Sequence, residues 1–217
     1  MKFNLLLPVI FSVLCLILFV GCQTEPKVAV SELCLPCEKA EGNQCVRDWL
    51  FLGPFRFKAE DFKGEHQQEV ADHAFMPNEC ALDGTQKAPK GTKWEPQSFE
   101  DSQINLDDVY GDIEYAVMYG VCWLQCKQDI PDATLMVGSD DYLTVWVNGK
   151  KVHTYKEQRR AGDLDQDEVK GIALKKGYNR IVVKCTDIVY DWNYYFRFTT
   201  KDGKDIKVKP IKVPEKK

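Results

Sequence analysis

Short apolar runs, many rich in β-branched and aromatic residues, recur along the chain from residue 46 and are separated by Gly, Pro, Asn and Asp. Such runs are typical of strands in a β-sandwich or barrel. No long segment has the 3.6-residue period of an amphipathic helix. The pattern predicts an all-β domain with strands at residues 49–52, 115–123, 133–137, 142–147, 169–174, 180–184 and 192–199.

In the last predicted strand, residues 192–199, apolar residues alternate strictly with residues that are mostly polar, so one face of the strand should lie in the core. The apolar face consists of Trp192, Tyr194, Phe196 and Phe198. Trp49 and Trp146 are expected to be core residues as well.

Two dipeptides predict hairpins between neighbouring strands. Asn148-Gly149 separates two alternating runs, and both residue types tolerate the positive φ of a two-residue hairpin turn. Lys176-Gly177 also separates two runs, which predicts a second hairpin with Gly177 in the left-handed region.

The amino terminus has the pattern of an export signal. Lys2 precedes an almost wholly apolar stretch, residues 5–20, which is shorter than the roughly 20 residues of a spanning helix. Gly21-Cys22 follows, and then the chain turns polar. This junction resembles the lipobox of bacterial lipoproteins, with Phe19 where leucine is usual. The resemblance implies cleavage before Cys22 and acylation of Cys22, whose several acyl chains would bind a membrane durably.

This interpretation gives a signal peptide at 1–21, a tether with a cysteine cluster at 22–45, a domain at 46–205 and a Lys-rich tail at 206–217. The protein is then expected on the extracytoplasmic side of the bacterial cell envelope, in the outer membrane or at the periplasmic face. An uncleaved membrane helix and a plain secreted protein are the alternatives.

Composition and charge narrow the class of partner. The 217-residue chain is long enough for one well-buried domain. Its net charge of −4 and the lack of a basic stripe argue against nucleic acid. The basic residues at 201–217 are expected to form a final strand and a solvated tail.

The cysteines would normally pair outside the cytoplasm. Apart from Cys15 and Cys22, the disulfide candidates are Cys34, Cys37, Cys45, Cys80, Cys122, Cys126 and Cys185. Their odd number leaves one thiol free, bridged to another chain or otherwise occupied. Cys34-Leu35-Pro36-Cys37 lacks the βαβ context of a redox pair, so a structural or interchain disulfide is the favoured reading.

Several turn and strand motifs follow one another in a recognisable order, at residues 49–55, 137–141, 145–152, 165–169, 174–180 and 192–198. This order resembles that of the galactose-binding-like jelly-roll domains attached to many bacterial surface proteins and glycosidases. The resemblance implies a single jelly-roll β-sandwich over about residues 48–200 and carbohydrate as the ligand class, although one fold hosts many functions.

The sequence departs from that pattern in two respects. Tyr142 stands where glycine usually follows the aspartate pair. Cys122, Cys126 and Cys185 stand where apolar strand residues are expected, which suggests cross-strand disulfides with Cys185 as one partner.

Asp140-Asp141 is the sharpest candidate site. Adjacent carboxylates suit a hard cation such as Ca²⁺, and the pair resembles that of protective-antigen-type sugar-binding domains, where it helps to hold calcium and sugar hydroxyls. The alternative is that Ser139 and both aspartates cap a turn through hydrogen bonds to the backbone.

A second acidic group offers calcium or salt-bridge chemistry. It consists of Asp163, Asp165, Asp167 and Glu168. The glycine and distal glutamate of a calcium loop are missing, and Arg159 and Arg160 lie just upstream. We therefore expect a solvated, salt-bridged loop.

Aromatic side chains in or beside predicted loops, or off the apolar strand face, could stack on sugar rings, with framework packing as the alternative for each. They are Trp94, Tyr110, Tyr155, Tyr190 and Tyr195. No catalytic residue is predicted, because His66, His73 and His153 are scattered and lie in no nucleophile context.

The sequence thus predicts a membrane-anchored, non-catalytic lipoprotein that binds carbohydrate. The alternatives are a structural or assembly lipoprotein that holds a cell-envelope protein and, third, a hydrolase.

Overall fold

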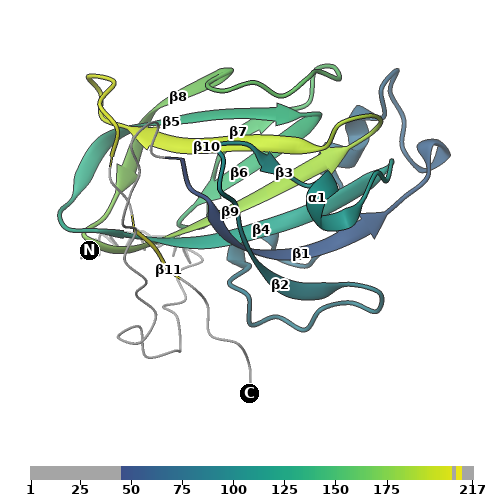
Figure 1. The fold of residues 1–217 in the computed structure, drawn as a ribbon, viewed down its shortest axis with the longest axis horizontal. Coiled ribbons are helices and arrows are strands. Elements are labelled where there is room, and N and C mark those ends of the chain that lie inside the picture. Colours follow the sequence, from purple (N-terminus) through teal and green to yellow (C-terminus); the bar gives the residue numbers. More distant parts are fainter. Residues whose placement is uncertain (1–44, 207–208, 212–217) are drawn as a thin grey trace, which may run out of the picture.

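The computed structural model describes residues 45–206 and 209–211. These residues form two antiparallel sheets packed face to face, so the predicted all-β sandwich is confirmed (Figure 1). Cys22, Cys34 and Cys37 lie outside the described residues. Within the described part of the chain, no helix has the length and apolar character needed to cross a bilayer.

The larger sheet has the strand order β2-β1-β4-β9-β6-β7, and β11 (Lys209–Ile211) also pairs with β4. Its other strands are β1 (Asp48–Arg56), β2 (Lys93–Ser98), β4 (Ala116–Cys126), β6 (Tyr142–Val147), β7 (Lys150–Tyr155) and β9 (Gly177–Asp187). Because β11 falls within residues 206–217, the predicted tail contains a strand.

The smaller sheet has the order β3-β10-β5-β8. Its strands are β3 (Ile104–Asn105), β5 (Ile130–Asp140), β8 (Asp167–Leu174) and β10 (Asn193–Thr199). Short helices lie outside the sheets: η2 (Ala59–Asp61), η3 (Gln68–Asp72), η4 (Glu79–Ala81) and α1 (Asp107–Tyr110). The chain passes between the sheets from β5 to β6, β7 to β8, β8 to β9 and β9 to β10, which is a jelly-roll arrangement.

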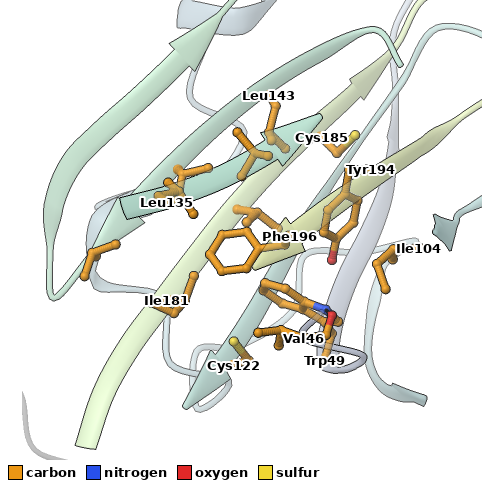
Figure 2. Packing of buried hydrophobic residues seen from close by; sticks show 14 of the residues in the cluster. Val46, Trp49, Ile104, Cys122, Leu135, Leu143, Ile181, Cys185, Tyr194 and Phe196 are labelled. Carbon is orange, nitrogen blue, oxygen red and sulfur yellow. Dashed lines mark hydrogen bonds between the residues drawn. The ribbon is translucent and has the colours of Figure 1, made fainter. Parts of the chain in front are cut away.

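The core lies between the sheets and follows the predicted alternation. Tyr194, Phe196 and Phe198 of β10 are fully buried, and Trp192 is buried as well. Trp49 meets Tyr194 and Phe196 edge to face, with ring centroids 5.5 and 5.3 Å apart (Figure 2). These edge-to-face contacts stabilise the packing of the two sheets against each other.

One predicted hairpin is confirmed and the other is wrong. Asn148 and Gly149, with φ of 51° and 82°, connect the paired strands β6 and β7. Gly177 has the expected left-handed φ of 90°, but β8 pairs with β5 whereas β9 pairs with β4 and β6. That turn therefore carries the chain from one sheet to the other. The Asn179 side chain closes it by accepting from Lys175 N and donating to Lys175 O.

The predicted cross-strand disulfides are also wrong, since no disulfide joins any two of the described cysteines. Cys122 lies opposite Ile181, whereas Cys185 lies opposite Met118. This offset of four residues along the ladder corresponds to roughly 13 Å, while a disulfide requires Cα atoms within about 7 Å. Cys122, Cys126 and Cys185 are instead buried thiols that fill the core as small apolar groups.

A second apolar layer, which the sequence pattern did not predict, covers the outer face of the larger sheet. Residues 57–88 contribute Val70, Met76 and Leu82 to this outer cluster, which also contains Trp146. Trp146 is buried as predicted, but outside the core between the sheets.

A buried charge pair holds this layer to the sheet. Lys184 of β9 is 1% exposed, and its Nζ donates to Glu79 Oε1 at 2.9 Å and to His73 O at 3.0 Å. The Tyr119 hydroxyl donates to the same Glu79 oxygen. Burial lowers the pKa of Lys184, and the charge of Glu79 opposes that shift. Glu79 therefore stabilises a cation that the sheet would otherwise bury alone.

Replacing Glu79 by alanine should destabilise the protein by about 3 kcal/mol, because it leaves Lys184 buried without its counter-charge. Urea unfolding followed by tryptophan fluorescence would measure the change. Glu60→Ala is the matched control, since its pair with Lys58 is exposed and should contribute little. Equal destabilisation by the two variants would contradict the role given to the buried pair.

Candidate functional site

Asp140 and Asp141 lie where the chain leaves β5 and crosses to β6 in the other sheet. The peptide bond between them is cis. Both side chains are buried, with exposed fractions of 6% and 2%. The pair is thus enclosed at the end of β5, which lies at the right of Figure 1.

The carboxylate of Asp141 connects two loops to this crossing. Its Oδ2 accepts from Ile188 N at 2.9 Å, and its Oδ1 accepts from Arg160 N at 3.3 Å. Ser139 Oγ donates to Asp141 O at 3.2 Å. The predicted side-chain to backbone bonds are therefore present, although Asp141 binds distant segments and not its own turn. We call the end formed by residues 107–115, 140–141, 159–162 and 187–192 the loop end.

Two further aspartates lie at the loop end, and the sequence pattern did not reveal them. Asp187, the last residue of β9, is 0% exposed, and neither of its carboxylate oxygens has a hydrogen-bond partner among the described residues. Asp107 Oδ2 accepts from Trp192 N at 3.0 Å, whereas its Oδ1 is buried and has no such partner. No local motif distinguishes these aspartates from surface residues, because the fold alone brings them to Asp140.

The electrostatics of these aspartates are unusual. Burial, followed by the charges of Asp141, Asp107 and Asp140, raises the pKa of Asp187 to about 9. Burial, followed by Asp141, raises the pKa of Asp140 to about 7. Burial also raises the pKa of Asp107. The loop end thus gathers carboxylates that favour a proton or a cation over the free charged state.

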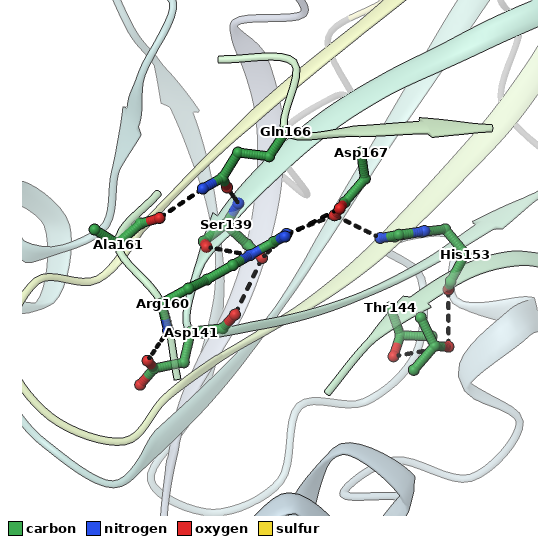
Figure 3. A network of polar contacts seen from close by, with 9 residues as sticks. Ser139, Asp141, Thr144, His153, Arg160, Ala161, Gln166 and Asp167 are labelled. Atoms are coloured by element: carbon green, nitrogen blue, oxygen red, sulfur yellow. Dashed lines mark hydrogen bonds and ion pairs between the residues drawn. The ribbon is translucent and has the colours of Figure 1, made fainter. Parts of the chain in front are cut away.

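Arg160 borders the aspartate pair and is held by a network of its own (Figure 3). Its Nε donates to Ser139 O at 3.2 Å, and its Nη1 donates to Asp167 Oδ1 at 3.0 Å. His153 Nε2 lies 3.2 Å from Asp167 Oδ2. The Tyr155 ring lies 3.5 Å from Arg160 Cζ, so it stacks on the guanidinium.

Asp165, Asp167 and Glu168 of the second acidic group each form an ion pair, as expected, and Asp163 is exposed. Arg197 Nε donates to Asp165 Oδ1 at 2.8 Å. Asp167 and Glu168 lie in β8 of the small sheet, so for these two residues the predicted loop is a strand.

The predicted aromatic platform residues separate into different regions of the fold. Tyr190, 77% exposed, follows the Ile188 that binds Asp141. Tyr155 stacks on Arg160 and packs against the outer cluster. Tyr195 is half-buried on the small sheet, opposite Gly138.

The other two aromatic candidates serve the framework. Trp94 is a correction to the predicted binding set, because it lies on the edge strand β2, donates to Gln86 O and packs against the outer cluster. Tyr110 stacks on Trp192, with ring centroids 5.3 Å apart. Tyr190 is therefore the predicted platform residue that both lies at the loop end and exposes its ring to solvent.

No protein-family model and no curated protein matches the sequence. Among solved structures, the PA14 sugar-binding domain from an RTX adhesin is 11% identical with a TM-score of 0.43, and the match covers 76% of this chain and 96% of that one. An anti-sigma factor domain-containing protein from Clostridium clariflavum is 10% identical with a TM-score of 0.42, over 59% of this chain and 45% of that chain. This chain therefore spans less than half of that protein.

The β-glucuronidase of Ruminococcus gnavus is 14% identical with a TM-score of 0.35, over 70% of this chain and 23% of the enzyme. These similarities concern the type of fold alone.

Proposed function

We propose that this protein is a non-catalytic lipoprotein, anchored through Cys22, that binds carbohydrate at the loop end of its sandwich. The observation that carries the proposal is an exposed tyrosine, Tyr190, beside a buried group of carboxylates. The signal-like amino terminus supports the anchor, and the sequence resemblance to galactose-binding-like domains supports the ligand class.

The two parts of the loop end match the two kinds of surface on a sugar. The Tyr190 ring is exposed, so it can pack against the apolar C–H face of a pyranose. Asp191, the neighbour of Tyr190, is exposed, and its carboxylate can accept hydrogen bonds from sugar hydroxyls. An aromatic platform with a few polar groups is the usual composition of a small-ligand site.

A bound calcium ion fits the charge of this site. Asp187 has two carboxylate oxygens without partners, and Ca²⁺ takes six to eight oxygen ligands. Asp140, Asp141 and Asp187 are the residues that would hold the ion. No three His, Cys, Asp or Glu side chains of the described residues already surround one point, so main-chain oxygens and side-chain rotation would complete the coordination.

A glycan array probed with the purified protein, with and without calcium, would test the proposal. Tyr190→Ala should weaken binding to any positive glycan about tenfold, which is about 1.4 kcal/mol, because the sugar loses its stacking surface. Asp140→Ala together with Asp141→Ala should abolish it. Tyr178→Ala is a matched control, since Tyr178 lies near the opposite end of β9. An array without any positive glycan would refute carbohydrate binding.

The buried carboxylates also predict how stability depends on pH and calcium. Because the pKa of Asp187 is raised to about 9, the unfolded chain releases this proton near pH 4 while the folded protein keeps it. Stability should therefore fall as pH rises between those values. In a chelator at pH 8, Asp187→Asn should raise the Tm by about 3 °C or more, and the gain should shrink at pH 4.

Calcium should raise the Tm of the wild-type protein more than that of Asp187→Asn, because a ligand stabilises the state that binds it. Scanning calorimetry would measure both effects, and Asp202→Asn, at an exposed position past the far end of β10, serves as the control. If the gain in Tm of Asp187→Asn does not depend on pH, and calcium does not raise the Tm of the wild-type protein, then neither the raised pKa of Asp187 nor its role as a calcium ligand is correct.

A further inference from the structure

The rim of the loop end is acidic beyond the buried aspartates. Its exposed acidic residues are Asp108, Asp112, Glu114 and Asp191. Asp107 lies half-buried between this rim and the interior. Arg160 borders the same region but is paired with Asp167, so the exposed Arg159 and Arg56 offset part of the rim. Negative charge therefore dominates this end of the molecule.

Hydrogen bonds place the exposed tyrosine against this acidic rim. Tyr190 and Asp191 belong to the loop that continues into Trp192, and Trp192 N donates to Asp107 Oδ2 at 3.0 Å. In return, Leu106 N donates to Trp192 O at 2.8 Å. The loop after β9, which carries Tyr190 and Asp191, and the start of α1 are thus fixed to each other.

The negative field at Tyr190 comes from the exposed rim and not from Asp187. Asp187 is fully buried, and burial followed by the charge of Asp141 raises its pKa to about 9, so Asp187 keeps its proton at neutral pH. The exposed carboxylates of the rim remain charged because water solvates them.

We propose that the ligand is a glycan with free amino groups, such as a deacetylated hexosamine polymer, and that polyanionic glycans are excluded. This inference rests on the proposed function and names the class of sugar for the same site. An ammonium group donates three hydrogen bonds, and the exposed carboxylate of Asp191 has two oxygens that can accept them. The same ammonium is attracted to the face of the Tyr190 ring, which also packs against the sugar.

The charge of the site explains why other sugars should bind less well. A neutral sugar would keep the contact with Tyr190 but would lose the charge-assisted hydrogen bonds to Asp191. A uronate or sulfated chain would place like charges beside Asp191 and the other exposed carboxylates of the rim.

Isothermal titration calorimetry on the full-length protein would test the preference for free amines with the hexasaccharides of glucosamine, N-acetylglucosamine and galacturonic acid. The first two differ only in the acetyl groups, which remove the positive charge of the amines. We expect glucosamine hexasaccharide to bind at least about tenfold more tightly than its acetylated counterpart, and the advantage to shrink as salt is raised. Galacturonate hexasaccharide should not bind.

Three variants connect the effect to the site. Asp191→Asn and Asp108→Asn should each reduce the preference for the free amine, because each removes an exposed negative charge from the rim and keeps an oxygen that can accept a hydrogen bond. Tyr190→Ala should weaken both hexosamine ligands. Asp202→Asn removes an exposed charge at the other end of the sandwich and should change neither. Circular dichroism would check that each variant is folded.

The outcomes separate this inference from the proposed function. Equal binding of the acetylated hexasaccharide, or binding of galacturonate, would overturn the amine selectivity and leave carbohydrate binding in place. If polylysine binds as tightly as glucosamine hexasaccharide, and Tyr190→Ala does not weaken that binding, the amine-glycan inference is wrong and the ligand is a basic peptide. If neither the array nor the titrations give binding, the proposed function itself fails.

Discussion

The burial of the Asp141 carboxylate at the crossing between the two sheets is the constraint on which the loop end depends. A carboxylate removed from water must accept hydrogen bonds, and Asp141 takes them from Ile188 N and Arg160 N. These bonds fix the loop after β9 and the loop before β8 relative to the end of β5. Tyr190 and the Arg160 network therefore hold their positions because one aspartate needs partners.

Asp187 shows the opposite condition at the same end of the sandwich. Its carboxylate is just as buried but has no hydrogen-bond partner in the described structure, and its neighbours are acidic. The structure accommodates such a group at a cost that protonation or a bound cation reduces. Residues 57–88 cover the outer face of the large sheet and are held to it through Lys184 and Glu79. At the loop end, by contrast, the ring of Tyr190 is largely exposed.

Much of the fold could be predicted from the sequence because alternation and turn residues act locally. The apolar face of β10 and the Asn148-Gly149 turn follow directly from residue order. The Lys176-Gly177 hairpin failed because a turn signal does not say which sheet receives the next strand. The pair Asp140-Asp141 was found by its adjacency, whereas Asp187 and Asp107 join it only through long-range packing. The cysteine pairing failed for the same reason, since strand register determines which thiols meet.

The central claim is that ligand binds to the loop end at Tyr190 and Asp191. Two-dimensional amide NMR of the isotope-labelled protein, titrated with glucosamine hexasaccharide, tests it most directly. The account predicts saturable shifts concentrated at residues 107–115 and 187–192, with the resonances of β7 and of the outer cluster unchanged. Shifts centred on the outer face of either sheet, with the loop end silent, would contradict it.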